Sequence, residues 1–213
     1  MDDLKRWRRD LHQIPELGLE ETQTTAYLKA ELEKMGYQPQ PLLETGLYVF
    51  IDHGYGKSVA FRTDIDGLPV NEETGVDFAS THKGIMHACG HDMHASMMLM
   101  CAKLLKQNEK KLKGQIKIVF QPHEEGLVGC KMMIEDGVLK YPRVDAAVGL
   151  HVMPATEDKT GTIRTIRKAM TTASTIFEIN ITGKSSHGSM PEKGIDALRV
   201  AVHRSEEHTS ELQ

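Results

Sequence analysis

Apolar residues recur every third or fourth position in three stretches of the chain, among charged neighbours, as in an amphipathic helix. These stretches are residues 4–14, 20–35 and 90–107. Pro15 limits the first predicted helix, and Gly36 follows the second as a C-terminal stop. The methionines of the third predicted helix are expected to fill the hydrophobic core rather than to bind a ligand.

Short apolar runs bounded by turn residues predict β-strands. They occur at residues 47–51, 58–63, 115–121 and 144–150, with a short helix expected at 127–135. Pro39 and Pro41 indicate a loop before the first strand. Phe177, Ile179 and Ile181 alternate with polar residues, which is typical of a half-exposed antiparallel strand. This change of strand style predicts that a second domain begins near residue 172.

Acidic and imidazole side chains follow three of the predicted strands directly. Asp64 and Asp66 leave the second strand, Glu124 and Glu125 leave the third, and His151 ends the fourth. The carboxyl ends of strands in an open α/β sheet meet at one edge, where ligands bind. We therefore expect these groups to share one rim of an α/β sheet.

The composition is that of an ordinary globular protein. The 213 residues are 39% hydrophobic and carry a formal net charge of −4, which gives no reason to expect nucleic acid or an anionic membrane as partner. No run spans a bilayer, and the N-terminus lacks a signal-peptide layout. Cys89, Cys101 and Cys130 are an odd number without CxxC spacing, which favours a reducing cytoplasm over a disulfide framework.

Residues 86–94 concentrate three histidines, one cysteine and one aspartate where a loop turns into a helix. Thiolate and imidazole together suit zinc or another divalent transition metal. A cysteine at a helix N-terminus also has a lowered pKa, so Cys89 and His91 could instead form a nucleophilic pair. A buried structural cysteine beside a surface histidine is the third interpretation.

The other candidates are ambiguous one by one. Of two adjacent glutamates, one can bind an ion while the other takes a proton from water, but Glu124 and Glu125 could also be exposed residues before a turn. His151 could be a packed residue at a strand end. His187 lies in the small-residue loop 183–191, which could approach a substrate or form a mobile turn.

Taken together, several stretches are recognisable: residues 8–13, 15–17, 62–69, 86–92, 120–126, 149–152 and 183–191. In this order, over residues 1–203, they resemble the metal-dependent amidohydrolases of the aminoacylase and hippurate hydrolase type. That family includes plant indole-acetyl-amino-acid hydrolases and bacterial N-acetyldiaminopimelate deacetylases. Any one stretch alone is weak, but the set is highly specific.

The resemblance implies a role for each candidate residue. It implies four ligands for one or two divalent ions (Mn²⁺, Zn²⁺ or Co²⁺): Cys89, His91, Glu125 and His151. Glu124 resembles the general base and later general acid, and Asp66 a carboxylate that orients a ligand. His187 resembles a lid-domain histidine that reaches the partner subunit's active site and helps to hold the oxyanion.

The implied fold is α/β, a three-layer catalytic domain of the metallo-aminopeptidase type with an inserted α/β lid that forms a homodimer. Residues 1–171 would belong to the catalytic domain and residues 172–203 to the start of the lid. The implied activity is hydrolysis of N-acyl amino acids to a carboxylic acid and an amino acid in the cytoplasm. A non-catalytic fragment that binds metal or substrate, and a cysteine hydrolase using Cys89 and His91, remain as alternatives.

The sequence departs from the family in two places. The family usually has a small residue where this chain has His123, whose ring we expect to point away from the site. The family's last metal ligand is a histidine near the C-terminus, which this sequence does not contain. Residues 204–213 resemble a translated sequencing adapter and are excluded from the fold, so the native protein is expected to continue beyond about residue 202.

Overall fold

A computed structural model describes residues 2–153, 159–165, 167 and 178–203. The chain divides into two compact units, Met1–Thr156 and Glu157–Gln213. The boundary predicted near residue 172 falls outside the described residues, as does the tail 204–213. The assignment of residues 172–203 to a lid therefore stays a prediction.

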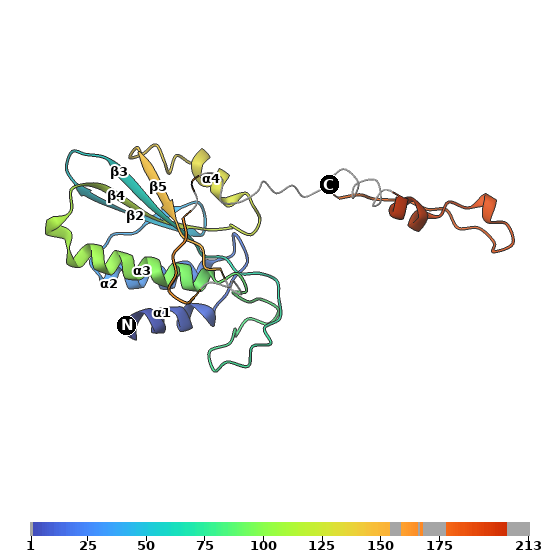
Figure 1. Ribbon diagram of the computed structural model, residues 1–213, viewed down its shortest axis with the longest axis horizontal. Helices are drawn as coiled ribbons and strands as arrows, with labels where there is room; N and C mark the ends of the chain where they lie inside the picture. The colour runs from blue at the N-terminus through green and yellow to red at the C-terminus, as the bar shows by residue number, and fades with distance from the viewer. Residues whose placement is uncertain (1, 154–158, 166, 168–177, 204–213) are drawn as a thin grey trace. The chain divides into compact units, whose positions relative to one another are not determined.

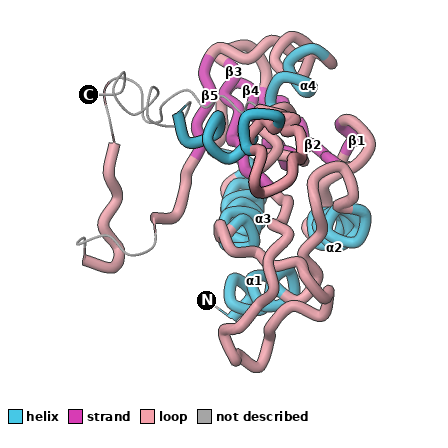
Figure 2. Tube along the Cα trace, turned by 90° about the vertical axis from the view of Figure 1, so that its right-hand side faces the viewer, coloured by secondary structure: helices cyan, strands magenta, loops and turns pink. Residues whose placement is uncertain are grey.

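The first unit is built on a mixed five-stranded sheet with the order β1-β2-β4-β3-β5. Its strands are β1 (Gln40–Leu42), β2 (Gly46–His53), β3 (Ser58–Asp64), β4 (Gly114–Gln121) and β5 (Ala146–Gly149). Strands β3, β4 and β5 are parallel, whereas β1 and β2 run antiparallel to their neighbours. Figure 2 shows β1 and β5 at opposite edges.

Helices form the layers on either side of this sheet (Figure 1). They are α1 (Asp2–His12), α2 (Thr22–Lys34), α3 (His91–Gln107) and α4 (Gly129–Glu135). Helices α2 and α3 pack on one face, with α1 against α3, and α4 packs against β4 from the other face. The main core contains Leu28, Leu99 and Phe120, and a smaller core around Val119 and Met133 lies under α4. This layering confirms the predicted α/β fold.

The ends of the helices follow the expected chemistry. Glu16 accepts backbone hydrogen bonds from Gln23 at 3.1 Å and Thr24 at 2.9 Å, so a carboxylate from the preceding loop caps the positive end of α2. Gly36 ends the same helix with φ +84°, a conformation that glycine adopts without strain. In α3, Met98 and Met100 pack against the core, as predicted.

Three sequence predictions need correction. Pro39 and Pro41 were expected in a loop, but Pro41 lies in β1, because a proline is tolerated on an edge strand that pairs on one side only. Helix α4 begins at Gly129 rather than at Leu127, whose φ of +60° is incompatible with a right-handed helix. The apolar strand expected at 144–150 shortens to β5, whose four residues are exposed at the sheet edge.

The second unit contains little regular structure among its described residues. Phe177 lies outside them, and residues 178–182 form no strand, contrary to the alternating pattern. A strand needs a hydrogen-bonded partner, and the described part of this unit pairs only Lys184 with Ile195. A 3₁₀ turn spans Pro191–Lys193, and residues 197–203 are helical.

A buried lysine on β4 supports the connection that leads to β5. The Lys117 ammonium donates hydrogen bonds to the carbonyls of Val138 at 2.6 Å and Tyr141 at 3.0 Å, and it lies 5.1 Å from the centre of the Tyr48 ring. Burial lowers the pKa of Lys117 below its usual range. Among the described helices, none combines the length and the apolar character that a membrane span requires.

Candidate metal centre

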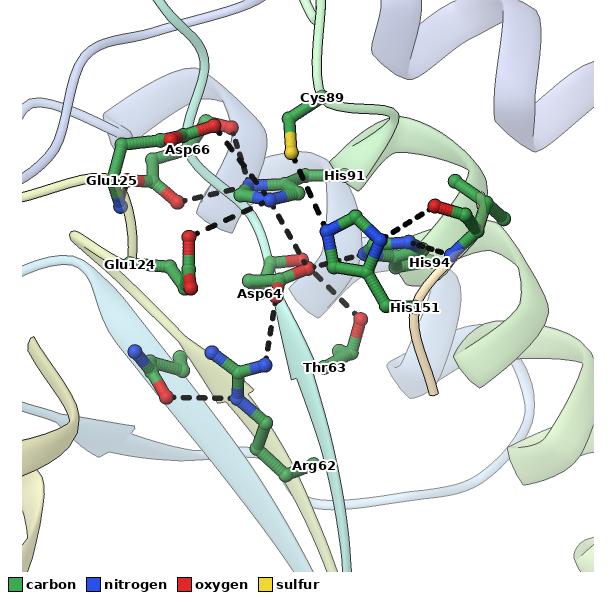
Figure 3. Close-up of polar contacts among 12 residues, drawn as sticks. Arg62, Thr63, Asp64, Asp66, Cys89, His91, His94, Glu124, Glu125 and His151 are labelled. Carbon is green, nitrogen blue, oxygen red and sulfur yellow. Dashed lines mark hydrogen bonds and ion pairs between the residues drawn. The ribbon is translucent and has the colours of Figure 1, made fainter. Parts of the chain in front are cut away.

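The carboxyl ends of the three parallel strands meet at one rim of the sheet, as the sequence predicts. Asp64 at the end of β3 stands opposite Gln121 at the end of β4, and Gly149 of β5 stands opposite Arg62. The residues that follow these strands include Asp66, Glu124 and Glu125, and His151. Figure 3 shows their side chains gathered around His91, at the first turn of α3.

The turn into α3 depends on Gly90. Its φ of +85° lies in the left-handed region, where a Cβ is strained. A Cβ at this position would also stand 2.8 Å from Cγ2 of Val152. Gly90 thus allows the chain to reverse between Cys89 and His91 while Val152, beside His151, approaches the same turn.

Hydrogen bonds determine which nitrogen of His91 is available. Its Nδ1 lies 2.9 Å from the backbone carbonyl of Asp66 and 3.1 Å from Asp66 Oδ1, so Nδ1 carries the proton and donates it. The Nε2 lone pair is then free. It is buried, without a hydrogen-bond partner among the described residues. A histidine oriented by a carboxylate in this way is a typical arrangement of a metal ligand.

Cys89 and His151 face each other beside His91. The Cys89 Sγ lies 3.4 Å from His151 Nε2, and His151 Nδ1 donates to the Val152 carbonyl at 2.5 Å. The Nε2 lone pair of His151 therefore also points into the cluster. Burial, together with the negative charge of Glu125, raises the pKa of the Cys89 thiol to about 12. Without a neighbouring cation this thiol stays protonated at neutral pH, which does not favour a nucleophilic thiolate.

The two glutamates approach His91 from the end of β4. Glu124 Oε2 and Glu125 Oε1 each lie 3.8 Å from His91 Nε2, too far for a hydrogen bond. Glu125 Oε1 is buried without a hydrogen-bond partner among the described residues, and its backbone N–H donates to Asp66 Oδ2 at 2.9 Å. Burial and the charge of Glu124 raise the pKa of Glu125. Asp66 thus orients both His91 and Glu125.

Asp64 lies beside the cluster, held by its own partners. Its Oδ2 accepts from Arg62 Nη1 at 2.8 Å, and its Oδ1 accepts from His94 Nδ1 at 2.6 Å. Burial alone would raise the pKa of Asp64, but the His94 hydrogen bond and the charges of His91 and Arg62 outweigh it and hold the pKa at about 2.

Two members of the 86–94 cluster, Asp92 and His87, belong to none of the groups of described residues that could hold an ion. Asp92 Oδ2 pairs with Arg8 Nε at 3.0 Å and with His12 Nδ1 at 2.8 Å, so it ties α1 to the start of α3. His87 is buried near His12, with ring centres 6.4 Å apart, and burial lowers its pKa to about 4. Asp92 thereby holds the start of α3, whereas both ring nitrogens of His87 are buried without a hydrogen-bond partner among the described residues.

His123 and His187 are placed as follows. The His123 ring packs against Gly18 and Gly126, where an added Cβ would stand 1.9 Å and 2.2 Å from ring atoms. It is in none of the described groups that could hold an ion, in keeping with the expectation that it points away. His187 belongs to the second unit, where its Nδ1 lies 2.8 Å from Ser189 Oγ. Its expected role at a partner's site stays a prediction.

The donor set fits a divalent transition metal. In the part of the chain that the structure describes, three groups have ligand atoms within 4.8 Å of one another: Cys89, His91 and His151; His91, Glu124 and Glu125; and Asp64, His91 and His94. Sulfur, imidazole and carboxylate are the ligands that Zn²⁺ and related ions take. The buried Nε2 of His91 and Oε1 of Glu125 lack other partners, which agrees with a site built around a cation.

Sequence reasoning missed the contribution of Asp64 and His94 to this site. Asp64 was expected at the rim and His94 in the cluster, but neither received a role. The available signal was spacing, because His91 and His94 are three residues apart on one helix and project from the same face. The hydrogen-bond partners of His94, Asp64 and Val152, are too distant in sequence for the spacing to identify.

Comparison with known proteins agrees with this chemistry. The N-acetyl-L-cysteine deacetylase of Bacillus subtilis is 44% identical over 193 residues, covering 90% of this chain and 45% of that protein. The IAA-amino acid hydrolase ILR1-like 4 of Arabidopsis thaliana is 40% identical, covering 91% of this chain and 43% of that protein. The chain therefore spans about half the length of these curated relatives.

Solved structures with a similar fold also include a metal-binding peptidase. The YXEP protein of Bacillus subtilis, described as a dinuclear metal-binding peptidase of the M20 family, aligns with a TM-score of 0.68 and 40% identity. The alignment covers 71% of this chain and 43% of that one. The sequence model of Peptidase family M20/M25/M40 matches residues 60–211. This chain belongs to the M20/M25/M40 family of peptidases.

Proposed function

We propose that the whole protein hydrolyses the amide bond of N-acyl amino acids in a metal-dependent reaction, releasing a carboxylic acid and an amino acid. The observation that carries the proposal is the convergence of Cys89, His151 and both glutamates on the free Nε2 of His91. Relatives support the substrate class. One is named for deacetylating N-acetyl-L-cysteine and another for hydrolysing an IAA–amino acid conjugate.

The ligands we assign to one or two divalent ions, Mn²⁺, Zn²⁺ or Co²⁺, are Cys89, His91, Glu125 and His151. The orientation of their lone pairs supports this assignment, because both histidines donate from Nδ1; Nε2 of His91 has no partner among the described residues, and Nε2 of His151 is directed at Cys89 Sγ. When bound, such an ion lowers the pKa of a coordinated water and polarises the carbonyl of the substrate. Asp66 holds two of the ligands in orientation through hydrogen bonds to His91 and Glu125.

Glu124 is the proposed general base. Its side chain is 31% exposed, against 24% for Glu125, and only Glu125 has a buried carboxylate oxygen without a partner among the described residues, which leaves Glu124 the more accessible of the two. Glu124 takes a proton from the attacking water and returns it to the leaving amine as the C–N bond breaks. His187 of a second subunit is proposed to stabilise the oxyanion, a contribution of about 3–4 kcal/mol for one preorganised donor. The active form would then be a cytoplasmic homodimer.

Replacing the proposed base tests the mechanism directly. Glu124→Gln in the complete protein should lower kcat for N-acetyl amino acids by roughly 10²–10⁴-fold, because the amide cannot accept the proton. Metal content, measured by elemental analysis, should stay that of the parent. Glu73→Gln, in an exposed loop, is the matched control and should keep full activity. Retained turnover in Glu124→Gln would refute the assignment of the base.

A further inference from the structure

His94 lies three residues after His91 on the first turn of α3 and is buried in the first unit. It faces His151, with ring centres 4.6 Å apart and planes at 71°. Its atoms also lie close enough to those of Asp64 and His91 to form a candidate metal-binding group. Proximity alone therefore leaves two roles open for His94, as a ligand or as a support for other residues.

The partners of the two ring nitrogens distinguish these roles. The backbone N–H of Val152 can only donate, and it lies 2.9 Å from His94 Nε2, so Nε2 accepts and carries no proton. In a neutral imidazole the proton must then be on Nδ1, which donates to Asp64 Oδ1 at 2.6 Å. Both nitrogens are engaged, and neither has a lone pair free for an ion.

The hydrogen bond to Val152 acts on the neighbouring His151. Val152 donates its N–H to His94 and accepts from His151 Nδ1 through its carbonyl, so both polar groups of its backbone are fixed. The same two contacts hold the His151 ring with Nε2 directed at Cys89 Sγ, 3.4 Å away. On the other side, His94 is held by Asp64 at the end of β3, whose second carboxylate oxygen accepts a hydrogen bond from Arg62.

We propose that His94 is a positioning residue that sets the orientation of His151 through the Val152 backbone, and that it is not itself a metal ligand. A chain of hydrogen bonds from Arg62 through Asp64 and His94 thus fixes the segment after β5 (Figure 3). The inference rests on the proposed function only in taking His151 as a ligand.

Two substitutions separate the two hydrogen bonds of His94. In His94→Gln the amide oxygen can replace Nε2 as acceptor for Val152, and in His94→Asn the amide N–H can replace Nδ1 as donor to Asp64. Zn²⁺ titration of the complete protein by calorimetry gives the affinity and the number of bound ions. His94→Asn should bind Zn²⁺ about 10–100-fold more weakly with unchanged stoichiometry, whereas His94→Gln should stay within a few-fold of the parent.

Each other result overturns the proposal. Equal affinity in all three proteins, or equal losses in both variants, would show that the acceptor for Val152 does not position a ligand. Loss of one bound ion in either variant would make His94 a ligand. His82→Asn, which replaces a loop histidine bonded to the Pro15 carbonyl, is the control and should leave Zn²⁺ affinity unchanged.

A second measurement needs no variant. Nitrogen-15 NMR of the histidine rings should show His94 in the Nδ1–H form both before and after Zn²⁺ is added. A large Zn²⁺-induced shift of His94 Nε2 would refute the proposal even if the variants fail to fold. Because both readouts follow metal binding and ring protonation, they remain decisive if the protein hydrolyses no amide.

Discussion

At His91 and His94, hydrogen-bond partners rather than residue type determine what each imidazole can do. Both rings are buried on the first turn of α3, and both donate from Nδ1 to an aspartate. They differ at Nε2, which is free in His91 and accepts the Val152 N–H in His94. Two histidines three residues apart are thereby suited to different roles.

A single substitution at Gly90 tests how the turn into α3 supports the site. Gly90→Ala adds the strain of a left-handed residue, about 1–2 kcal/mol, and a Cβ 2.8 Å from Val152 Cγ2. Displacing Val152 disturbs His151, so Zn²⁺ affinity measured by calorimetry should fall about tenfold or more, which corresponds to at least about 1.4 kcal/mol of binding free energy.

Gly75→Ala is the matched control for this substitution. Gly75 also has a positive φ, +69°, but an added Cβ there meets nothing within 4 Å. Gly75→Ala should therefore share the backbone strain and keep the parent's Zn²⁺ affinity. Similar affinities in the two variants would mean that the contact with Val152 does not matter for the site.

The candidate residues of the site could be predicted from sequence because each one follows a strand or opens a helix. Cys89, His91, Glu124, Glu125 and His151 all stand at such positions, and the rim of a parallel sheet brings them together. The assignment of ring protons could not be predicted. It depends on Asp66, Asp64 and Val152, whose distances from the histidines are set only by the folded chain.

Among the elements, β4 supports both the candidate metal centre and the connection that leads to β5. Its end leads to Glu124 and Glu125, while Lys117 in its middle holds the connection between α4 and β5 by hydrogen bonds to backbone carbonyls. That connection continues through β5 to His151. The buried lysine therefore stabilises, at a distance, the segment that carries a proposed ligand.

Replacing Lys117 has two opposing effects on the free energy of unfolding. Lys117→Met removes the cost of burying a charge, but it leaves the Val138 carbonyl without a donor. We expect the second effect to win and the free energy of unfolding to fall by about 1–3 kcal/mol in urea titrations. Lys113→Met, on the exposed turn before β4, should change it by less than about 0.5 kcal/mol. An equally or more stable Lys117→Met would contradict this role.

The elements that could be predicted are those in which apolar residues recur regularly or form a continuous run. The helices α1, α2 and α3 and the strands β2, β3 and β4 lie within a few residues of their predicted ranges. Strand β1 was not predicted, because Pro39 before it and Pro41 within it indicate a loop. The described residues 178–182 form no strand although their pattern alternates, since alternation predicts one face of a strand but not the strand beside it.

At the scale of the whole molecule, the chain supplies one unit with a candidate metal centre and a second unit that carries His187. The family is established, and the chain spans about half the length of the relatives it matches. A metal-dependent mechanism uses Cys89 as a metal ligand, whereas a cysteine hydrolase would use it as the nucleophile. The two mechanisms predict different activities after the ion is removed.

The most direct test is therefore the release of amino acid from N-acetyl amino acids by the complete protein, before and after dialysis against a chelator. The account predicts loss of nearly all turnover after chelation and its recovery when Mn²⁺, Zn²⁺ or Co²⁺ is added back. Turnover that survives complete removal of metal, verified by elemental analysis, and that a thiol alkylator then abolishes would contradict the account and assign the reaction to Cys89.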